Sequence, residues 1–186
     1  MIVIGITGTN GSGKGAIVQY LKKKGYKHFS AREFIVNKIK EKGMDVNRNS
    51  MRIIADDMRK KFGPSYIIDS LYFESIKSKN NSIIESIRCP GEILSLKKNK
   101  NFYLFSVDAP RNIRFERISK RNSSTDNVSF EEFVSQEEME WNNIEPIKMN
   151  VRKCIELSDY KFINDKDFLS LHMAIDVALK DIKTKG

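Results

Sequence analysis

A glycine-rich segment from Gly8 to Lys14, with the spacing G-x-x-x-x-G-K, constrains the fold of this chain more than any other part of its sequence. It follows the apolar, β-branched run Ile2 to Ile6, which is typical of a buried strand, and it precedes apolar residues at helical spacing from Ala16 to Leu21. Glycines let the backbone wrap closely around an anion with its N–H groups inward, and a helix N-terminus adds partial positive charge. The segment therefore predicts a phosphate-binding loop between a strand and a helix. The alternative is a glycine turn that only joins the two.

The predicted loop supplies the candidate nucleotide-binding residues. Lys14 is long enough to reach the β- and γ-phosphates of a nucleotide as a point charge. The Ser or Thr that usually follows this lysine is absent, because the next two residues are Gly15 and Ala16. Without that hydroxyl, a Mg²⁺ ion must be held by the nucleotide, by waters and by a carboxylate elsewhere. The candidates are Gly8, Thr9, Asn10, Gly11, Ser12, Gly13, Lys14, Gly15 and Ala16.

Short apolar runs alternate with segments of helical periodicity along the chain. Strands are predicted at 2–6, 27–29, 82–85, 102–107 and 160–163. The first predicted helices run from 16 to near Gly25, from a Ser30 cap to 42, and in two pieces over 48–79 broken at Gly63-Pro64. The later ones are predicted at 93–97 after a Cys89-Pro90-Gly91 turn, from Pro110 to 118, at 130–141, after Pro146 up to 157, and at 167–183. This alternation predicts an α/β fold, in which a parallel sheet has helices on both faces.

The composition limits the class of protein. The 186 residues include 33 Lys and Arg against 24 Asp and Glu, a net charge of +9, and this mixture is typical of one globular domain. The longest apolar runs have about six residues, whereas a membrane helix needs about 20. Cys89 and Cys154 form no metal or disulfide pattern, so we expect reduced thiols and a cytoplasmic protein. Since no basic segment precedes the first apolar run, we expect no signal peptide.

Several segments resemble nucleoside monophosphate kinases and dephospho-CoA kinase, which are P-loop kinases with an adenylate kinase-like fold. Lys14-Gly15 resembles the G-K-G of adenylate kinase, in which Thr normally follows where this chain has Ala16. Ser82 to Arg88, with the later Glu92, resembles a segment of deoxynucleoside monophosphate kinases. Three further segments carry the resemblance: Val107-Asp108-Ala109-Pro110 to dephospho-CoA kinase, Glu116 to Arg121 to the lid of adenylate kinase, and Asp159 to Asp165 to a C-terminal segment that several of these kinases share.

The resemblance spans about residues 5–165 and implies a five-stranded parallel sheet with an acceptor-binding insert and a mobile lid. On this basis we expect a single domain with a core of residues 1–30, 80–118 and 146–186, a helical insert at 31–79 and a lid region at 119–145. The pattern of strands and helices independently predicts the same two helical excursions. Residues 122–128 are polar and rich in turn formers, which is typical of a mobile loop.

Phosphoryl transfer needs in-line positioning and cations around the developing charge, so arginines at the ends of elements are candidates for catalysis. Arg117 and Arg121 lie four residues apart on one predicted helix face, so both heads could contact one phosphate chain. Arg88 follows a predicted buried strand, at the sheet edge where ligands of α/β proteins bind. Glu85 ends that strand and is the candidate to hold a Mg²⁺-bound water or to accept from the nucleophile. Together with Lys14 these are the predicted catalytic residues; a solvated basic face is the alternative for the arginine pair.

The predicted insert supplies candidates for binding an acceptor. Its first helix begins at Ser30, and Arg48 and Arg52 lie four residues apart in the following helix. A solvated face is an equal alternative for these arginines. The predicted substrate-binding residues are Ser30, Arg32, Arg48, Arg52 and Arg88. By the family parallel, Asn164 and Asp165 form the loop beneath an adenine base, and a simple Asn-Asp turn is the alternative.

These features favour an ATP-dependent kinase that uses Mg²⁺ and moves the γ-phosphoryl group to a small, phosphorylated, nucleotide-like acceptor. A (deoxy)nucleoside monophosphate kinase is the first hypothesis, from the acid-x-x-Arg spacing at 85–88 and the arginine-rich segment 48–59; dephospho-CoA kinase is the second, from Val107 to Pro110. A P-loop module that binds nucleotides or nucleic acids with little catalysis is the alternative of another class. The scattered basic residues form no stacking platform, which disfavours a nucleic-acid partner. We expect no membrane partner, and the sequence specifies no oligomeric state.

Overall fold

The computed structural model describes residues 1–121, 128–145 and 148–185. Its centre is a sheet of five strands in the order β2-β3-β1-β4-β5. The strands are β1 (Val3–Gly8), β2 (Lys27–Ser30), β3 (Ser82–Glu85), β4 (Phe102–Asp108) and β5 (Tyr160–Ile163). Every neighbouring pair is parallel. The predicted α/β fold with a five-stranded parallel sheet is therefore confirmed.

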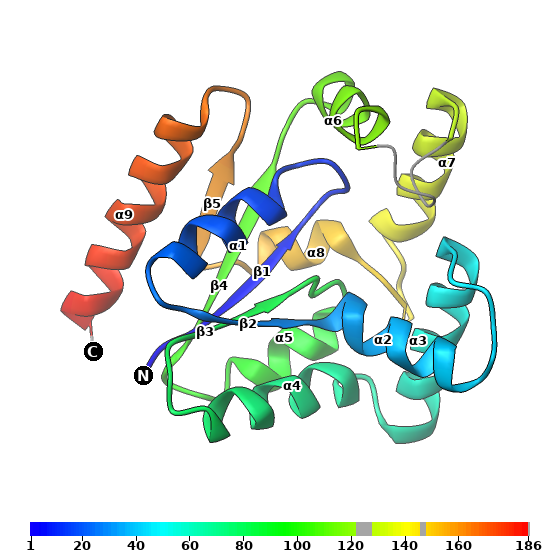
Figure 1. Cartoon of the computed structure of the whole chain (residues 1–186), viewed down its shortest axis with the longest axis horizontal. Helices are drawn as coiled ribbons and strands as arrows, with labels where there is room; N and C mark the ends of the chain where they lie inside the picture. Colours follow the sequence, from blue (N-terminus) through cyan, green and yellow to red (C-terminus); the bar gives the residue numbers. More distant parts are fainter. Residues whose placement is uncertain (122–127, 146–147, 186) are drawn as a thin grey trace.

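Helices connect the strands and cover both faces of the sheet (Figure 1). α1 (Lys14–Lys23) and α9 (Phe168–Lys185) bury apolar side chains against one face, around Phe105. α2 (Ala31–Glu41), α3 (Arg48–Phe62), α4 (Tyr66–Lys77), α5 (Pro90–Leu96) and α8 (Val151–Glu156) share the apolar cluster of the other face. α6 (Arg111–Ser119) follows β4, and α7 (Phe130–Trp141) lies beside it past the carboxyl ends of the strands (Figure 1).

The position of β1 decides where a ligand site can form. All six residues of β1 are buried, and the strand pairs with β3 on one side and β4 on the other. The chain therefore leaves β1 at the point where the strand order reverses. In open α/β sheets, ligands bind in the crevice outside the carboxyl ends of the strands at such a point. The segment Gly8 to Lys14 follows β1 directly and lies in this crevice.

Two predicted helix boundaries are wrong. The Cys89-Pro90-Gly91 segment is not a separate turn before a helix at 93–97, because α5 begins at Pro90, and the side chain of Glu92 accepts from the backbone N–H of Cys89 over 3.0 Å. Proline suits this position because it fixes the helical φ angle and its missing N–H would have no partner there. The helix predicted after Pro146 and up to 157 is α8, which begins only at Val151 because Asn150 caps it at the N–H of Lys153.

Pro146 itself, and residues 122–127 of the predicted mobile loop, lie outside the described residues. Within the described ranges, no helix is long and apolar enough to cross a membrane. Cys89 and Cys154 are buried free thiols.

Candidate functional site

The segment Gly8 to Lys14, here called the phosphate loop, turns from β1 into α1 around its glycines. Gly13 caps α1 with a φ of 107°, and Gly11 has a φ of 79°, a left-handed conformation that favours glycine. Lys14 is the first residue of α1 and is buried. Its Nζ donates to the carbonyl oxygens of Gly8, over 3.0 Å, and Thr9, over 2.7 Å. The ammonium therefore lies inside the curve of its own loop, where bound phosphates would be.

Two residues from neighbouring strands brace the phosphate loop. The hydroxyl of Thr9 donates to Oδ1 of Asp108, at the end of β4, over 2.5 Å. The amide of Asn164, just after β5, donates to the carbonyl oxygen of Ser12 over 2.8 Å. Asn164 is buried beneath the loop, whereas the next residue, Asp165, is exposed. These bonds fix the loop to the β4-β5 side of the sheet.

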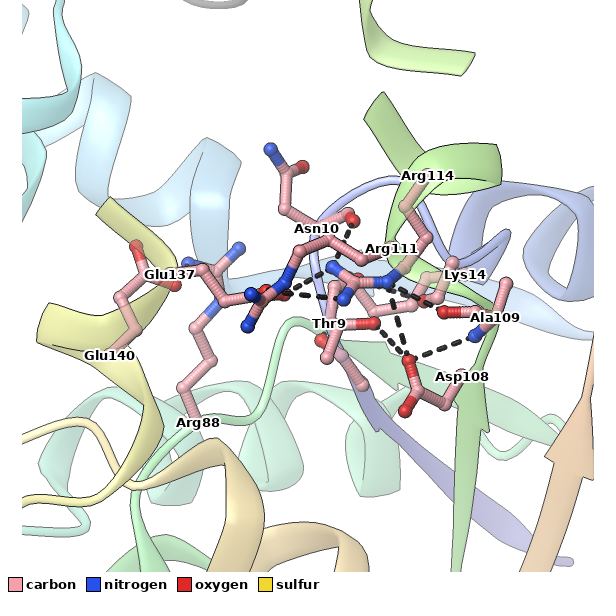
Figure 2. Close-up of polar contacts among 12 residues, drawn as sticks. Thr9, Asn10, Lys14, Arg88, Asp108, Ala109, Arg111, Arg114, Glu137 and Glu140 are labelled. Atoms are coloured by element: carbon pink, nitrogen blue, oxygen red, sulfur yellow. Dashed lines mark hydrogen bonds and ion pairs between the residues drawn. The ribbon is translucent and has the colours of Figure 1, made fainter. Parts of the chain in front are cut away.

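Arg114 is a third brace, and the sequence interpretation missed it. It is buried on α6, where Nε donates to the carbonyl oxygen of Ala109 over 2.7 Å and Nη1 donates to that of Asn10 over 3.3 Å (Figure 2). Its guanidinium also pairs with the carboxylate of Glu137 on α7, which Arg111 contacts through Nε over 2.9 Å. The only sequence signal for Arg114 is its position one helical turn before Arg117. Nothing in that position distinguishes a buried arginine from a solvated one.

Lys14 lies in a strongly electrostatic environment. Burial and the nearby charge of Arg88 lower the pKa of the Lys14 ammonium from its ordinary value of 10.5 to about 7. The carboxylates of Glu85 and Glu140 oppose that shift in the pKa, and the charge of Arg121 adds to it. The predicted residues Arg88, Glu85 and Arg121 thus lie close enough to Lys14 to affect its ionisation. A phosphate group placed among them would raise this pKa and favour the charged lysine.

Glu85 ends β3 beside the phosphate loop. Its Oε2 lies 3.0 Å from Nε2 of His28, a partner that the sequence interpretation did not assign. Burial alone would raise the pKa of the Glu85 carboxyl, but the contact with His28 and the charges of Lys14 and Arg88 lower it below its ordinary value. Glu85 is therefore a carboxylate at neutral pH. The residue that follows it, Ser86, has a φ of 71°, a strained conformation of the kind that clusters at functional sites.

The donor set fits a Mg²⁺ ion that is held largely by a nucleotide. Among the described residues, no three Asp, Glu, His or Cys side chains gather as a metal site. Glu85 offers one ionised carboxylate, and Gly15 and Ala16 offer no hydroxyl. Mg²⁺ commonly binds through one or two carboxylates, substrate phosphates and several waters. Glu85 is thus the residue here that would hold such an ion, directly or through a water.

A cavity of about 250 Å³ opens next to the phosphate loop, between α2, α3, the end of β3 and α7. We call it the arginine cavity. Its polar lining includes the arginines Arg32, Arg48, Arg52, Arg59 and Arg88 together with Asn10, Gln136 and Glu140. Its apolar lining includes Ala31, Ile35, Met51, Met139 and Met149. The lining of the cavity thus combines five arginines with apolar side chains.

Three polar atoms of residues that line the arginine cavity are buried without a hydrogen bond in the part of the chain that the structure describes. They are Nδ2 of Asn10, Nη1 of Arg59 and Oε1 of Gln136. Nη1 of Arg59 has an ion-pair partner, Oδ1 of Asp56, at 3.7 Å. A buried polar group without a partner costs free energy, so the atoms of Asn10 and Gln136 point to a ligand or to bound water.

Four of the five predicted substrate-binding residues line the arginine cavity: Arg32, Arg48, Arg52 and Arg88. Ser30 does not line it, and its hydroxyl accepts from the N–H of Glu33 over 3.2 Å as the cap of α2. The sequence interpretation missed Arg59, which is buried and donates to Oε1 of Glu92 through Nε, over 3.1 Å, and Nη2, over 2.9 Å.

The two arginines of the predicted lid, Arg117 and Arg121, differ in their exposure to solvent. Arg117 belongs to the last turn of α6, and its Nη1 is one of the buried nitrogens without a hydrogen bond within the described residues. Arg121 lies two residues past the end of that helix and is exposed. The pair therefore lies at the carboxyl end of α6, with Arg117 half-buried and Arg121 exposed.

Comparisons with known proteins agree on the class of fold. A family profile described as an AAA domain matches residues 4–143. A UPF0200 protein of Pyrococcus abyssi is 26% identical over 187 residues, which cover 97% of each chain. A shikimate kinase from Aquifex aeolicus superposes with a TM-score of 0.53 over 100% of both chains at 18% identity. A gluconokinase from Sinorhizobium meliloti superposes with a TM-score of 0.56 over 93% of this chain and 88% of its own, at 11% identity. At such low identities these two structures establish the fold alone.

Proposed function

The chain belongs to the AAA domain family and has the fold of a P-loop kinase, and from this premise we propose that it is an ATP-dependent phosphotransferase. One observation carries the proposal: the phosphate loop and the arginine cavity adjoin each other, since Asn10 of the loop lines the cavity and Arg88 of the cavity lowers the pKa of Lys14. A donor nucleotide on the loop would thus face an acceptor in the cavity. This arrangement supports transfer of a phosphoryl group between two anionic ligands.

The acceptor that fits the arginine cavity best is a (deoxy)nucleoside monophosphate. Arginine forks suit the oxygens of a phosphate group, and five arginines line the cavity. The apolar lining residues Ile35, Met51 and Met139 would pack against a flat base. Asn10 and Gln136 would supply a donor and an acceptor to polar groups of that ligand.

The alternative acceptor, dephospho-CoA, was suggested by the segment Val107 to Pro110. In the structure, Asp108 of this segment accepts from Thr9 and from the N–H of Ala109, so it supports the phosphate loop. The segment does not line the arginine cavity. It therefore gives no support for a particular acceptor, and the nucleoside monophosphate is the preferred proposal.

Each of the predicted catalytic residues has a role in this proposal. Lys14 would release the carbonyl oxygens of Gly8 and Thr9 and bind the β- and γ-phosphates. Arg88 would hold the acceptor phosphate in line, and Arg117 and Arg121 would stabilise negative charge on the transferred group. Mg²⁺ bound with ATP would neutralise the phosphate oxygens, and the ionised Glu85 would orient it. Asn164 and Asp165 would lie next to the adenine base.

The experiment that tests the function is an acceptor screen. Purified protein, ATP and Mg²⁺ are incubated with each of the nucleoside and deoxynucleoside monophosphates and with dephospho-CoA, and formation of ADP is measured. We expect at least one monophosphate to stimulate ADP formation. Lys14→Ala should abolish this turnover, whereas Lys23→Ala, an exposed lysine of the same helix, should leave it unchanged. Stimulation by dephospho-CoA alone would replace the preferred acceptor.

A second result would replace the enzymatic proposal itself. If no acceptor stimulates turnover and the protein binds DNA or RNA with a steep dependence on salt, the chain is a binding module. As for its compartment, we propose the reducing cytoplasm, which the buried free thiols of Cys89 and Cys154 support.

A further inference from the structure

Glu140, on the last turn of α7, is the one acidic residue among the described residues that line the arginine cavity. Its Oε2 accepts from Nη1 of Arg88 over 2.7 Å, and its Oε1 lies 4.0 Å from Nη1 of Arg48. The two arginines come from separate segments, the loop after β3 and the start of α3. Figure 2 shows the side chains of Arg88 and Glu140 side by side. A carboxylate of the chain thus contacts two of the cations that would bind an acceptor.

The neighbouring acid Glu137 holds α7 in place without using the same arginines. It lies one helical turn before Glu140 and pairs with Arg111 and Arg114 of α6. The side chain of Glu137 is 8% exposed, whereas that of Glu140 is 21% exposed. The helix is therefore anchored at Glu137, and Glu140 can leave Arg88 by rotation of its own side chain.

We propose that Glu140 is a specificity-determining residue, which occupies Arg88 and Arg48 until a doubly charged phosphate group of the acceptor replaces it. A carboxylate and a phosphate group use the same guanidinium donors, so they exclude each other. A phosphate monoester brings about two negative charges and three acceptor oxygens, whereas a carboxylic acid brings one charge and two oxygens. A phosphate group therefore interacts more strongly with Arg88 and Arg48 than the carboxylate that it displaces. A carboxylic acid interacts with them no more strongly than Glu140 does. The result is selection of phosphorylated acceptors against simple carboxylic acids.

This inference rests on the proposed function, because it assumes an acceptor that carries a phosphate. Its test is a binding measurement that needs no turnover. Inorganic phosphate and acetate are the two probes, and Trp141 is the reporter. It is the one tryptophan of the chain, it follows Glu140 directly, and with Glu140 and Asn10 it lines a small hollow beside the phosphate loop. Release of Glu140 from Arg88 should change its fluorescence.

The variants are Glu140→Gln and a matched control, Glu138→Gln, which makes the same charge change at an exposed position of α7. We expect Glu140→Gln to bind phosphate about tenfold more tightly than the wild type, which corresponds to about 1.4 kcal/mol. Acetate must displace the same carboxylate, so its affinity should rise by a similar factor, and it should bind measurably only where Glu140 is absent. Glu138→Gln should stay within about twofold of the wild type for both anions, because its neighbourhood is solvent.

A double variant locates the bound anion. The tighter phosphate binding expected of Glu140→Gln should be absent when Arg88→Ala is added to it. The guanidinium for which Glu140 and phosphate compete is then missing, so the two substitutions are not additive. Glu140→Asp keeps the negative charge but moves the carboxylate away from Arg88, because its side chain is shorter. Its phosphate affinity should therefore lie between those of the wild type and Glu140→Gln. The inference is overturned if Glu140→Gln binds phosphate no more tightly than the control, or if acetate binds the wild type as tightly as it binds Glu140→Gln.

The two proposals fail in different ways. If phosphate binding changes as described while no phosphorylated acceptor stimulates ADP formation, the proposed function is wrong and Glu140 still selects anions. If an acceptor stimulates turnover while phosphate binding is insensitive to residue 140, the role of Glu140 is wrong and the proposed function stands.

Discussion

The side-chain amide of Asn164 donates to the carbonyl oxygen of Ser12 over 2.8 Å, although the two residues lie 152 positions apart. Both partners are buried, so this bond ties the phosphate loop to the end of β5. Replacement of Asn164 by Ala would leave a buried carbonyl without a donor. A loss of this kind costs about 1–3 kcal/mol of the free energy of unfolding. We expect Asn164→Ala to show that loss in urea unfolding, together with a smaller increase in melting temperature on addition of ATP.

The matched control is Asn112→Ala, because Asn112 is exposed on α6. A substitution at such a surface position usually changes the free energy of unfolding by less than about 0.5 kcal/mol. Equal effects of the two variants would contradict the bracing role of Asn164.

Gly13 and Gly15, two positions apart at the start of α1, allow the effect of an added Cβ to be compared. A Cβ at Gly13 would lie 2.1 Å from Nδ2 of Asn164, and its φ of 107° is strained for any other residue, whereas a Cβ at Gly15 meets no atom within 4 Å. Gly13→Ala should therefore destabilise the protein by more than about 1 kcal/mol and weaken nucleotide binding, while Gly15→Ala should stabilise it by about 0.4–1 kcal/mol. Urea unfolding and ATP titration check both. Similar effects at the two glycines would contradict this account of the loop.

The fold was predictable because its signals are local. β1 and β3 are short, buried runs rich in β-branched residues, and the glycine spacing of the phosphate loop has meaning only between a strand and a helix. The start of α8 was not predictable in this way. Asn150, which caps it, also donates through Nδ2 to the carbonyl oxygen of Asn143 over 2.7 Å, and this contact exists only once α7 is packed. Proline 146 was the stronger local signal, and it was misleading.

The position of the candidate site was predictable from local signals, which are the glycine motif, the ends of strands and the spacing of arginines. Glu85 ends β3 and Arg88 follows it, and the arginines predicted in the insert helices line the cavity. The contact of His28 with Glu85 depends on the pairing of β2 with β3, which brings Ser30 opposite Glu85, and no local pattern specifies it. The acidic residues of α7 are typical of a solvated face in sequence. Glu137 and Glu140 became part of the site only through arginines of other elements.

Arg114 and Arg111 allow a buried and an exposed ion pair to be compared by their contributions to the free energy of unfolding. Both contact Glu137, but the side chain of Arg114 is 6% exposed and that of Arg111 is 48% exposed. Arg114→Ala should lower the free energy of unfolding by about 3–5 kcal/mol, because it leaves Glu137 partly unpaired in a buried position and releases the carbonyl oxygens of Asn10 and Ala109. Arg111→Ala should cost less than about 1 kcal/mol. Urea unfolding followed by the fluorescence of Trp141 gives both values, and a larger effect at Arg111 would refute the assignment.

The pKa of about 7 at Lys14 predicts a pH dependence of nucleotide binding. Above this pH the lysine of the free protein is mostly neutral, and bound phosphates raise its pKa, so binding must take up a proton. Affinity for ATP should fall as the pH rises from 7.5 to 9, by up to about tenfold per pH unit. Isothermal titration calorimetry at pH 8, in buffers of different ionisation enthalpy, should show uptake approaching one proton per ATP. Lys14→Arg keeps a permanent charge, so its affinity should not change over this range. If the ATP affinity of the wild type is also independent of pH over this range, Lys14 is already protonated in the free protein.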